Sequence, residues 1–546
     1  MAGTQTFDYD VIIVGAGISG MYQLYRLRQL GLSVRVFEAG SGVGGTWYWN
    51  RYPGCRFDSE SYSYGYSFSE ELLQEWDWSE HFAAQPETLR YLNHVADKFD
   101  LRRDIRFDSR VATARYDETA NCWHVELESG EQASARFLIS ATGPLSAPQM
   151  PNIDGIDSFR GESFHTALWP RDPEGYGGRK DIMFDGKRVG VIGTGATAVQ
   201  LIQEVAKTAG ELFVFQRTPN WCAPLHNAPI SADEQRTIKA SSADIFRRCN
   251  ETFGGFLHGM VHESALDASP EEREAFFEKL YAEPGFGIWL GNYADTMTDP
   301  RANKLLSDFI AGKIRQRVKD PAVAEKLIPN NHGFGTRRVP METNYYEVYN
   351  QDNVTLVDIR EAPIERVTET GIKTTDNDYT LDMIVYATGF DAVMGALNRI
   401  DIRGVGGQKL KEKWANGPST YLGMQTLGFP NFFTLVGPHN GATFCNIPRC
   451  IAQNVEWVTA ALGYLRDHDY QRMEPTREAE TAWSDHVDET AAGTLFPTAD
   501  SWFMGVNQNI PGRQKRRFLL YAGGAPKYRE KCDQVAANDY EGFALG

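Results

Sequence analysis

Asp10-Val-Ile-Ile-Val-Gly15-Ala-Gly17-Ile-Ser-Gly20, near the start of the chain, is the stretch that decides the fold. Its apolar residues predict a buried strand that runs through three glycines into a helix. Gly15 allows a tight turn, Gly17 lets a pyrophosphate approach the backbone, and Gly20 lets the helix pack closely on the strand. The helix N-terminus offers free N–H groups and the positive end of a dipole to the phosphates. The stretch therefore predicts a Rossmann-like dinucleotide-binding unit.

The residue that ends the next expected strand indicates which nucleotide this unit binds. The segment Ser33–Phe37 is apolar in alternation and is followed by Glu38. A carboxylate at this position can accept hydrogen bonds from the two hydroxyls of an adenosine ribose. The first unit therefore predicts a nucleotide whose ribose carries no phosphate.

The same pattern returns at Lys187-Arg-Val-Gly-Val-Ile-Gly193-Thr-Gly195-Ala-Thr-Ala198, followed by a helical stretch and the strand Leu212–Gln216. This second unit ends in Arg217 instead of an acid. A guanidinium can bind a ribose 2′-phosphate with two parallel hydrogen bonds, which predicts NADPH. The alternative interpretation is that Arg217 is only a solvated surface charge.

Two apolar strands that end in Ala-Thr-Gly flank the second unit, at Phe137–Gly143 and Met383–Gly389. Such strand ends recur where a chain crosses between nucleotide-binding domains. Two different nucleotides together indicate a flavin that is reduced by a nicotinamide. We therefore expect an α/β protein with two Rossmann-like domains, an FAD domain that is discontinuous in sequence, and a helical insertion.

The expected domain division follows these crossings. Residues 226–329 lack glycine motifs and read as amphipathic helices, for example Glu271–Leu280, so we expect a helical insertion that covers the active site. The segment Pro170–Asp185 is a longer loop than the fold requires. The predicted parts are 1–147 (FAD domain, first part), 148–225 (NADPH domain, first part), 226–329 (insertion), 330–384 (NADPH domain, second part) and 385–546 (FAD domain, second part).

Length and charge limit the class of protein. A chain of 546 residues is too long for one hydrophobic core, so two or three domains are expected. A net charge of −17 argues against a nucleic-acid partner or an anionic membrane. No basic leader precedes the first strand, and no apolar stretch approaches the roughly 20 residues that span a bilayer. Seven scattered cysteines predict reduced thiols and a cytoplasmic location.

A fingerprint lies between the two units, in Phe159-Arg-Gly161-Glu-Ser-Phe-His165-Thr-Ala-Leu-Trp169-Pro170. It matches the FxGxxxHxxxW(P/D) pattern of the type I Baeyer–Villiger monooxygenases, and the resemblance covers nearly the whole chain. The stretch Gly44–Gly54 resembles the FAD-contacting segment of that family. Four residues apart on the connector between domains, His165 and Trp169 are expected to order this linker and not to act in acid–base chemistry.

The resemblance also implies roles for individual residues. Arg338, in Gly335-Thr-Arg-Arg338, corresponds to the active-site arginine, and Asp58 is expected to orient it. Arg337 stands where the family usually has a lysine that contacts the NADPH phosphate, and Trp502 resembles a tryptophan that reaches the nicotinamide nucleotide. The further predicted cofactor contacts are Ser19, Thr46, Trp47, Tyr64, Val111, Gly193, Thr194, Gly195, Ala196, Thr197, Thr218 and Ile447, and Phe444 and Ile447 are expected to line the substrate pocket.

The chemistry that the resemblance implies uses FAD, NADPH, molecular oxygen and a ketone. NADPH reduces the flavin, which forms a C4a-peroxide with oxygen, and the peroxide attacks the ketone carbonyl to give an ester or a lactone. A guanidinium stays protonated at any working pH, so Arg338 can stabilise the negative charge that develops on oxygen. Bound NADP⁺ is expected to complete the site after it has donated its hydride.

Three other functions remain open at this point. A flavin monooxygenase that oxidises nitrogen or sulfur atoms shares both nucleotide units, although its fingerprint usually lacks a tryptophan such as Trp169. A disulfide reductase needs a Cys-x₄-Cys pair early in the FAD domain, whereas the one pair with that spacing, Cys445 and Cys450, lies near the C-terminus and is interpreted as coincidence. The third is a nucleotide-binding protein without catalysis. No metal site is expected, and the oligomeric state and the identity of the ketone are not predicted.

Overall fold

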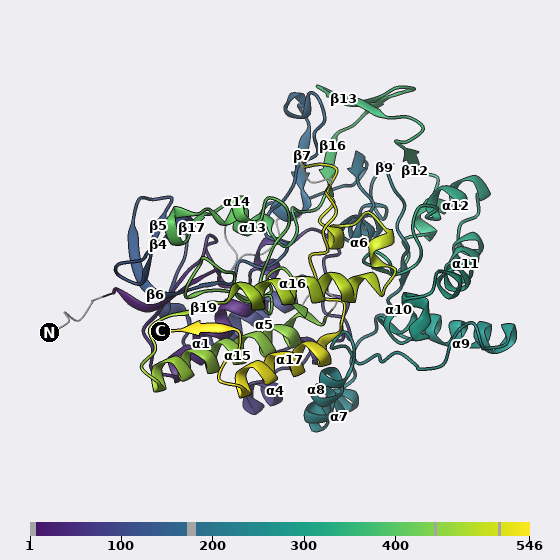
Figure 1. The fold of residues 1–546 in the computed structure, drawn as a ribbon. Coiled ribbons are helices and arrows are strands. Elements are labelled where there is room, and N and C mark those ends of the chain that lie inside the picture. The colour runs from purple at the N-terminus through teal and green to yellow at the C-terminus, as the bar shows by residue number, and fades with distance from the viewer. Residues whose placement is uncertain (1–6, 172–181, 442–444, 511–514) are drawn as a thin grey trace.

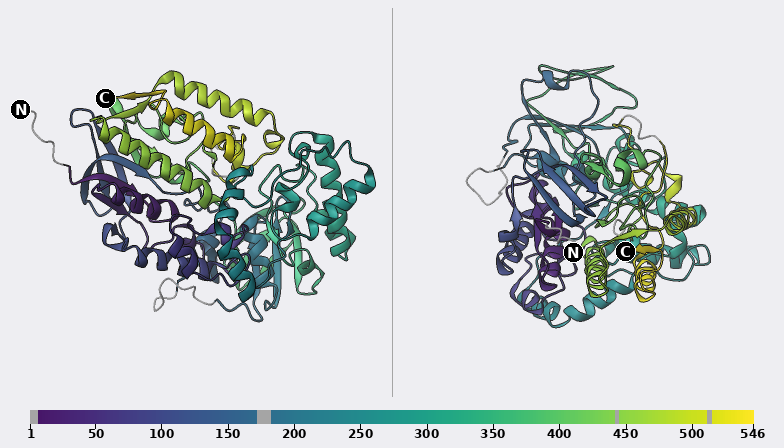
Figure 2. Two further views of the ribbon diagram at one scale, coloured as in Figure 1. Left: turned by 90° about the horizontal axis from the view of Figure 1, so that it is seen from below. Right: turned by 60° about the vertical axis from the view of Figure 1, so that its left-hand side comes forward.

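Two parallel β-sheets, each bordered by helices, form the body of the molecule (Figure 1). The computed structural model describes residues 7–171, 182–441, 445–510 and 515–546. In the views of Figures 1 and 2 the N-terminal and C-terminal segments share one side of the molecule, and the middle of the chain lies on the other. The expected α/β class with two nucleotide-binding folds is confirmed.

The first sheet is built around β1 (Tyr9–Val14), whose residues Val11, Ile12 and Ile13 have no exposed surface. It has eight strands in the order β17-β4-β5-β6-β1-β2-β3, and β18 pairs with β6. Strands β3, β2, β1, β6 and β18 run parallel to one another. The other strands are β2 (Val34–Phe37), β3 (Ile105–Arg106), β4 (Val111–Asp117), β5 (Cys122–Leu127), β6 (Gln132–Ser140), β17 (Asp401–Arg403) and β18 (Phe432–Thr434).

The second sheet has five parallel strands in the order β12-β9-β8-β16-β7. They are β7 (Glu162–His165), β8 (Arg188–Ile192), β9 (Glu211–Gln216), β12 (Val354–Asp358) and β16 (Met383–Tyr386). The expected domain border after residue 384 falls inside β16. Beside this sheet lies a small antiparallel one, which the sequence did not predict, formed by β13 (Ile364–Thr368), β14 (Gly371–Thr374) and β15 (Asp378–Thr380).

The two Ala-Thr-Gly segments have the same place in the two sheets. Strand β6 pairs with β1, and β16 pairs with β8, so each segment follows the strand next to a glycine motif. A Cβ atom on Gly15 would lie 2.6 Å from the Ala141 carbonyl oxygen, and one on Gly193 would lie 2.5 Å from that of Ala387. Each motif therefore needs glycine first, because the neighbouring alanine carbonyl occupies the space of a side chain.

Helices fill the region from residue 226 to 329, as predicted (Figure 1). Two of them begin at capping boxes, in which Ser231 pairs with Glu234 and Ser269 pairs with Glu272. The helices are α7 (Ala232–Ala240), α8 (Ser242–Glu251), α9 (Pro270–Ala282), α10 (Gly287–Leu290), α11 (Pro300–Arg317) and α12 (Pro321–Leu327). Figure 2 shows α9 to α12, in teal, projecting at one end of the molecule.

The remaining helices border both sheets, and the one that follows the second glycine motif contacts β8. Helix α1 (Ile18–Gln29) packs against the long α15 (Ile447–Asp467), and α15 packs against α17 (Ala525–Ala537). The C-terminal segments β19 (Met473–Pro475) and β20 (Phe543–Leu545) pair antiparallel. The other helices of four or more residues are α2 (Thr46–Trp49), α3 (Ser61–Tyr64), α4 (Glu70–Glu75), α5 (Gln85–Lys98), α6 (Ala196–Val205), α13 (Gly395–Asn398), α14 (Leu410–Lys413) and α16 (Arg477–Ala492).

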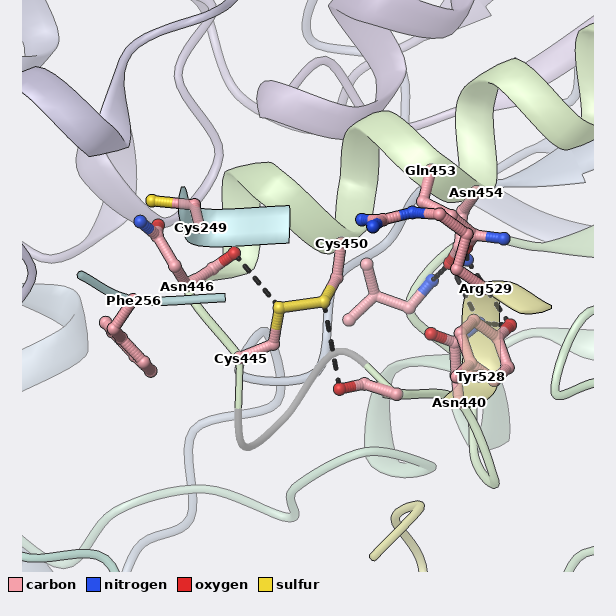
Figure 3. Close-up of a disulfide and its surroundings, with 12 residues drawn as sticks. Cys249, Phe256, Asn440, Cys445, Asn446, Cys450, Gln453, Asn454, Tyr528 and Arg529 are labelled. Atoms are coloured by element: carbon pink, nitrogen blue, oxygen red, sulfur yellow. Dashed lines mark hydrogen bonds between the residues drawn. A yellow bond between two sulfur atoms is a disulfide. The ribbon is translucent and has the colours of Figure 1, made fainter. Parts of the chain in front are cut away.

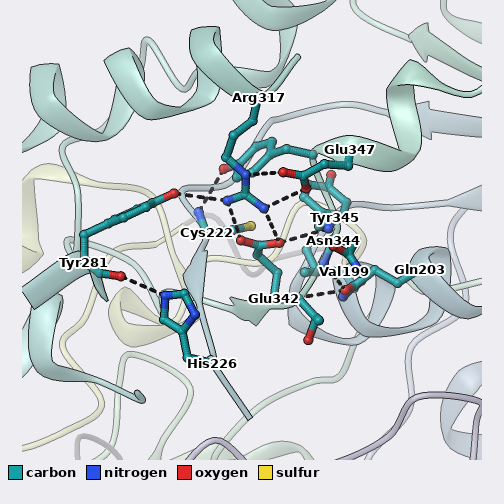
Figure 4. Close-up of polar contacts among 12 residues, drawn as sticks. Val199, Gln203, Cys222, His226, Tyr281, Arg317, Glu342, Asn344, Tyr345 and Glu347 are labelled. Carbon is teal, nitrogen blue, oxygen red and sulfur yellow. Dashed lines mark hydrogen bonds and ion pairs between the residues drawn. The ribbon is translucent and has the colours of Figure 1, made fainter. Parts of the chain in front are cut away.

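An ionic cluster ties the insertion to the short strand β11 (Met341–Glu342) (Figure 4). Arg317, at the end of α11, donates five hydrogen bonds of 2.6–3.1 Å to Glu342, Glu347 and the Tyr281 hydroxyl. Burial would lower the pKa of Arg317, but the hydrogen bonds to the two carboxylates raise it above the ordinary value. We call these four residues the Arg317 cluster. It fixes β11, which follows Arg338 closely in the sequence.

The cysteines correct one prediction. Cys445 and Cys450 form a disulfide at the start of α15, close to Cys249 and Phe256 (Figure 3). The expectation that all seven cysteines are reduced thiols is therefore wrong for this pair, and their spacing is not coincidental. Cys450 lies in the first turn of α15 and Cys445 lies just before the cap residue Asn446, so the entry of the chain into the helix brings the two Cα atoms within 6.4 Å. The other five described cysteines are buried and form no disulfide: Cys55, Cys122, Cys222, Cys249 and Cys532.

Candidate functional site

The first glycine motif forms a cradle that has room only for backbone. A Cβ atom on Gly45 would lie 2.8 Å from the Gly17 Cα atom, so the two loops approach each other at glycine. Helix α1 begins at Gly17 without a side-chain cap, which leaves its first N–H groups available to an anion. These features fit the pyrophosphate of a dinucleotide.

Glu38 holds this cradle together. Its carboxylate accepts hydrogen bonds from the Ala16 and Gly40 backbone N–H groups, each at 2.7 Å. Burial raises the pKa of Glu38, and the two backbone hydrogen bonds oppose that shift. The sequence did not predict this bracing role. A carboxylate oxygen can accept more than one hydrogen bond, so the predicted ribose contact remains compatible with it.

The other predicted FAD-side residues lie on several elements around this cradle. Trp47, on α2, donates a hydrogen bond of 3.0 Å from its indole nitrogen to the Tyr64 hydroxyl of α3. Val111 begins β4 and is buried, whereas Ile447 begins α15 and is half-buried. Ser19 is buried in the first turn of α1, and Thr46 is exposed at the start of α2. Their contacts with a cofactor stay a prediction.

The second glycine motif is open at its centre. No atom lies within 4 Å of a Cβ atom placed on Gly195, and α6 begins there without a side-chain cap. The Thr194 hydroxyl donates a hydrogen bond of 2.8 Å to the Thr218 carbonyl, which links the glycine turn to the end of β9. Ala196 and Thr197 form the first turn of the helix. The open turn and the uncapped helix fit a second dinucleotide.

Two arginines beside this turn lack a carboxylate in contact among the described residues. Arg217 is exposed and donates to the Asn509 side-chain oxygen at 3.3 Å. The Arg337 Nε atom is buried and has no hydrogen-bond partner in the part of the chain that the structure describes. Desolvation lowers the pKa of both; for Arg337 the charge of Asp500 opposes this shift and the charge of Arg217 adds to it. Two arginines of like charge beside an open nucleotide turn are suited to bind an anion such as a 2′-phosphate.

Arg338 and Asp58 are brought into contact although 280 positions separate them in sequence. The Arg338 Nη2 group donates to Asp58 Oδ2 at 2.8 Å, and Nη1 donates to the Val339 carbonyl at 2.9 Å. The arginine side chain keeps 30% of its surface exposed, against 9% for the aspartate. Burial raises the pKa of Asp58, and the guanidinium opposes that shift. One edge of the guanidinium is therefore held while the rest remains available.

Two aromatic rings from the insertion lie against the same guanidinium. The Arg338 Cζ atom lies 4.6 Å from the ring centre of Phe286 and 5.6 Å from that of Trp289. Rings at this range attract a cation and exclude water from its face. Sequence reasoning missed both residues. The signal that could have drawn attention to them is the run Pro284-Gly-Phe-Gly287, since glycines on both sides of an aromatic residue are typical of a close backbone approach.

The comparisons with known proteins agree with this geometry. Residues 8–226 match the model of the flavin-binding monooxygenase-like family. The 2-oxo-Δ³-4,5,5-trimethylcyclopentenylacetyl-CoA monooxygenase of Pseudomonas putida is 54% identical over 98% of this chain and 98% of its own length. Two relatives, each 42% identical over 98% of this chain, are a Baeyer–Villiger monooxygenase of Pseudooceanicola batsensis (95% of its length) and the phenazine N-monooxygenase PhzNO1 of Lysobacter antibioticus (97%).

The solved structure of OTEMO in complex with FAD and NADP superimposes with a TM-score of 0.96 and 54% identity, covering 99% of this chain and 100% of that one. The chain belongs to the Baeyer–Villiger monooxygenases. It is an FAD- and NADPH-dependent flavoprotein monooxygenase, as the sequence resemblance implied. The disulfide-reductase and non-catalytic alternatives are thereby set aside.

The fingerprint of the Baeyer–Villiger monooxygenases has a packing role in this chain. A Cβ atom on Gly161 would lie 2.6 Å from the Asp382 carbonyl oxygen, and the Trp169 ring is 2% exposed, between Phe164 and Phe184. His165 accepts a hydrogen bond from the Ala167 N–H group at 3.1 Å, and burial lowers its pKa to about 4. The imidazole is therefore neutral near pH 7, in keeping with a role in ordering the linker. The remaining fingerprint residue, Phe159, packs against the core of the second sheet.

The remaining predicted features of this monooxygenase are Trp502, Phe444 and the Pro170–Asp185 loop. Trp502 begins a short 3-10 helix (Trp502–Met504) and is half-buried against Phe503. Phe444 and most of the Pro170–Asp185 loop lie outside the described residues. Within the described ranges, no helix has the length and apolar character of a membrane span. In the same ranges no group of His, Cys, Asp and Glu could hold a metal ion.

Proposed function

We propose that this monooxygenase inserts one oxygen atom from O₂ next to the carbonyl of a bulky or cyclic ketone, with Arg338 as the catalytic residue that stabilises negative charge on oxygen. The observation that carries the proposal is the arrangement of its guanidinium. Asp58 holds one edge at 2.8 Å, two aromatic rings lie against it, and three of its five N–H groups have no partner among the described residues.

Each cofactor has a set of residues that would hold it. FAD would lie with its pyrophosphate on Gly15, Gly17 and the first turn of α1. NADPH would lie on Gly193 and Gly195, with its 2′-phosphate between Arg217 and Arg337. When bound and reduced, FAD supplies the reaction with O₂, and NADPH supplies the hydride. The chain supplies binding, orientation and the exclusion of water.

Arg338 and Asp58 divide the work. A guanidinium remains charged at any working pH, and donors that are fixed in advance stabilise developing charge most strongly where water is excluded. The carboxylate of Asp58 keeps the guanidinium aimed, because a bond to one terminal nitrogen fixes the plane of the group. Asp58 is therefore a positioning residue, and the N–H groups that face away from it are those that meet the reacting oxygen.

The substrate class rests on the relatives. The Pseudomonas putida relative is named for a cyclopentenylacetyl-CoA ketone, and it aligns over 98% of both chains. This supports a cyclic or bulky ketone, and Phe444 and Ile447 remain proposed pocket residues. We also propose that the enzyme acts in the cytoplasm and that the sheets correspond to an FAD domain in two parts and an NADPH domain in two parts. The helical insertion would then cover the active site.

Product analysis tests this proposal. The holoenzyme is incubated with NADPH, oxygen and a panel of cyclic and linear ketones, and the products are identified by mass spectrometry. Esters or lactones that carry one atom of ¹⁸O from labelled O₂ are expected. Unlabelled products, or NADPH oxidation that yields only hydrogen peroxide with every ketone, would contradict it.

Oxidation at nitrogen is a second candidate, because the relative PhzNO1 is named as an N-monooxygenase and is 42% identical. The same assay with phenazines, tertiary amines and thioethers distinguishes the two activities. Amine oxides or sulfoxides without any ester would favour this candidate over ketone oxygenation, although the enzyme would still be a flavin monooxygenase.

A further inference from the structure

Two acidic residues of one short segment contact two different basic side chains. Asp58 contacts Arg338, and Glu60, two residues further on, accepts a hydrogen bond of 2.9 Å from His258 Nε2. Arg338 follows the insertion in sequence, whereas His258 lies within it, between α8 and α9. The segment 58–60 therefore contacts both the helical insertion, at His258, and the segment after the insertion, at Arg338. The sequence indicated only the first of these contacts.

The pair of Glu60 and His258 is enclosed. The side chains are 8% and 18% exposed, and the Glu60 Oε2 atom is buried without a hydrogen-bond partner in the described part of the chain. A buried carboxylate with an unmatched oxygen is costly, so its presence calls for an explanation. A buried pair kept at this cost is expected to have a role, and it packs closely against one backbone turn.

That backbone is the turn Gly285–Gly287. A Cβ atom on Gly285 would lie 3.2 Å from His258 Nε2 and 3.3 Å from Glu60 Oε1. One on Gly287 would lie 3.5 Å from His258 Nδ1. Gly285 has φ +75°, a conformation that favours glycine, so the turn is shaped to let the hydrogen-bonded pair approach on both sides of one residue. His258 therefore packs closely against both glycines of this turn.

The residue between these glycines is Phe286, whose ring lies 4.6 Å from the Arg338 Cζ atom. The ring is 1% exposed and also packs against Phe256 and Trp289. Trp289 in turn lies where a Cβ atom on Gly335 would be, 2.5 Å from its indole nitrogen, and Gly335 leads directly to Arg338. The turn thus contacts the Arg338 side chain through the ring of Phe286. Through Phe286 and Trp289 it also reaches Gly335, in the segment that leads to Arg338.

We propose that Glu60 and His258 are positioning residues for Arg338: their hydrogen bond fixes the Gly285–Gly287 turn, which holds the ring of Phe286 against the guanidinium. Asp58 holds one edge of the guanidinium through a hydrogen bond, and the turn holds the ring of Phe286 against its face. The inference rests on the proposed function, because it assigns these residues to the aim of Arg338. It extends the site to a pair whose hydrogen bond does not itself include Arg338.

The test measures how many moles of ester form per mole of NADPH oxidised in Glu60→Ala, His258→Ala and the double variant. A displacement of about 1 Å at a reacting centre costs up to about 10²-fold in rate. We expect kcat for ester formation to fall about tenfold or more in each single variant, with the KM for NADPH and the rate of flavin reduction unchanged. The double variant should lose no more than the worse single variant, because the two residues act as one unit. Glu60→Gln, which can still accept from His258, should recover part of the loss.

A matched control separates positioning from simple loss of stability. Lys413 and Glu480, in the C-terminal part of the chain, form an ion pair of similar burial, 14% and 9% exposed. Lys413→Met should lower the thermal midpoint while leaving the ratio of ester to NADPH unchanged. If Glu60→Ala and His258→Ala behave like this control, or if their losses simply add, the inference is wrong. If the unaltered enzyme forms no ester from any ketone, the proposed function fails instead.

Discussion

Two arginine regions of this molecule differ in how completely their donors are used. In the Arg317 cluster, five hydrogen bonds reach two carboxylates and a tyrosine, and Glu342 has no exposed surface. The second region consists of Arg217, Arg337 and Arg338, and we call it the open cationic edge. Among the described residues, Asp58 forms an ion pair with Arg338, and no carboxylate forms one with Arg217 or Arg337. A closed cluster holds structure in place. An open one leaves donors for a group that the chain does not itself contain.

The difference has a physical basis. Removing a charge from water costs several kcal/mol unless it is paired, so a buried arginine that serves the fold should be saturated. An arginine whose pKa is lowered by desolvation and by a like charge, as for Arg337, retains a cost that an incoming anion can remove. Unused donors beside a glycine turn therefore indicate ligand binding more reliably than the number of arginines does.

The largest effect that this comparison predicts is on the closed cluster. Arg317→Met leaves Glu342 buried without its cation, which costs about 3–5 kcal/mol locally. We expect a clear drop in the thermal midpoint of the full-length holoenzyme. Arg315→Met, on the same helix, removes an exposed pair with Glu325 and should cost no more than about 1 kcal/mol. Equal midpoints for the two variants would mean that the cluster does not anchor β11.

The next effect concerns the open edge and the choice of nucleotide. Arg217→Ala removes a charged donor from the proposed phosphate site, which is worth about 10- to 100-fold in affinity. The KM for NADPH should rise by that factor while the KM for NADH stays unchanged. Arg160→Ala, at an exposed pair with Glu369, is the control and should change neither. A parallel rise for NADPH and NADH would show that Arg217 does not contact the 2′-phosphate.

A pH-dependent effect comes from buried histidines that stay neutral and, among the described residues, are not paired with a carboxylate. Burial lowers the pKa of His165 and His439 from 6.5 to about 4, and burial and Arg337 lower that of His332 to about 3. The unfolded chain binds these protons first, so stability is complete above about pH 6.5 and falls as the pH drops toward 4. Each histidine contributes at most about 1.4 kcal/mol per pH unit.

The thermal midpoint measured between pH 7 and pH 4 checks this prediction. His439→Gln, which keeps a polar side chain in the same place, should make the profile less steep than that of the unaltered enzyme. Replacing His124, whose side chain is 56% exposed, should leave the slope as it was. A midpoint that rises on acidification would contradict the assignment of neutral buried imidazoles.

The smallest effect is a count of thiols. Because Cys445 and Cys450 are joined, unfolded protein without reductant should react with a thiol reagent at five cysteines, and reduced protein should react at seven. Seven reactive thiols before reduction would show that the start of α15 is not held covalently. Ile447, a proposed pocket residue, lies between the two bonded cysteines, so the thiol count also shows whether the segment around it is held by a disulfide.

Local sequence was sufficient for much of this molecule. Strand, glycine turn and helix are neighbours in sequence, so the motifs at Gly15 and Gly193 predicted both sheets correctly. Contacts between distant segments were harder. The approach of Gly15 to Ala141 explains why the Ala-Thr-Gly segments recur, yet only the folded chain shows it. The meeting of Asp58 and Arg338 was expected from resemblance and not from spacing.

The rest depended on packing between elements with no shared pattern. Phe286 and His258 lie in an insertion that carries no motif, and their value comes from what faces them after folding. The sequence suggested a ribose contact for Glu38 and gave no sign that its carboxylate also accepts hydrogen bonds from the Ala16 and Gly40 N–H groups. Composition misled at Cys445 and Cys450, because a rule for whole chains says nothing about one helical turn.

The most direct test of the central claim is a single turnover with Arg338→Ala. Enzyme reduced by one equivalent of NADPH is mixed with oxygenated buffer and a ketone that the unaltered enzyme converts, and the ester formed is measured over time. Loss of a charge-stabilising donor should slow ester formation by about 10²–10³-fold while the preceding flavin reduction keeps its rate. Arg338→Lys should fall between the two. Ester formation at the unaltered rate in Arg338→Ala would contradict the account.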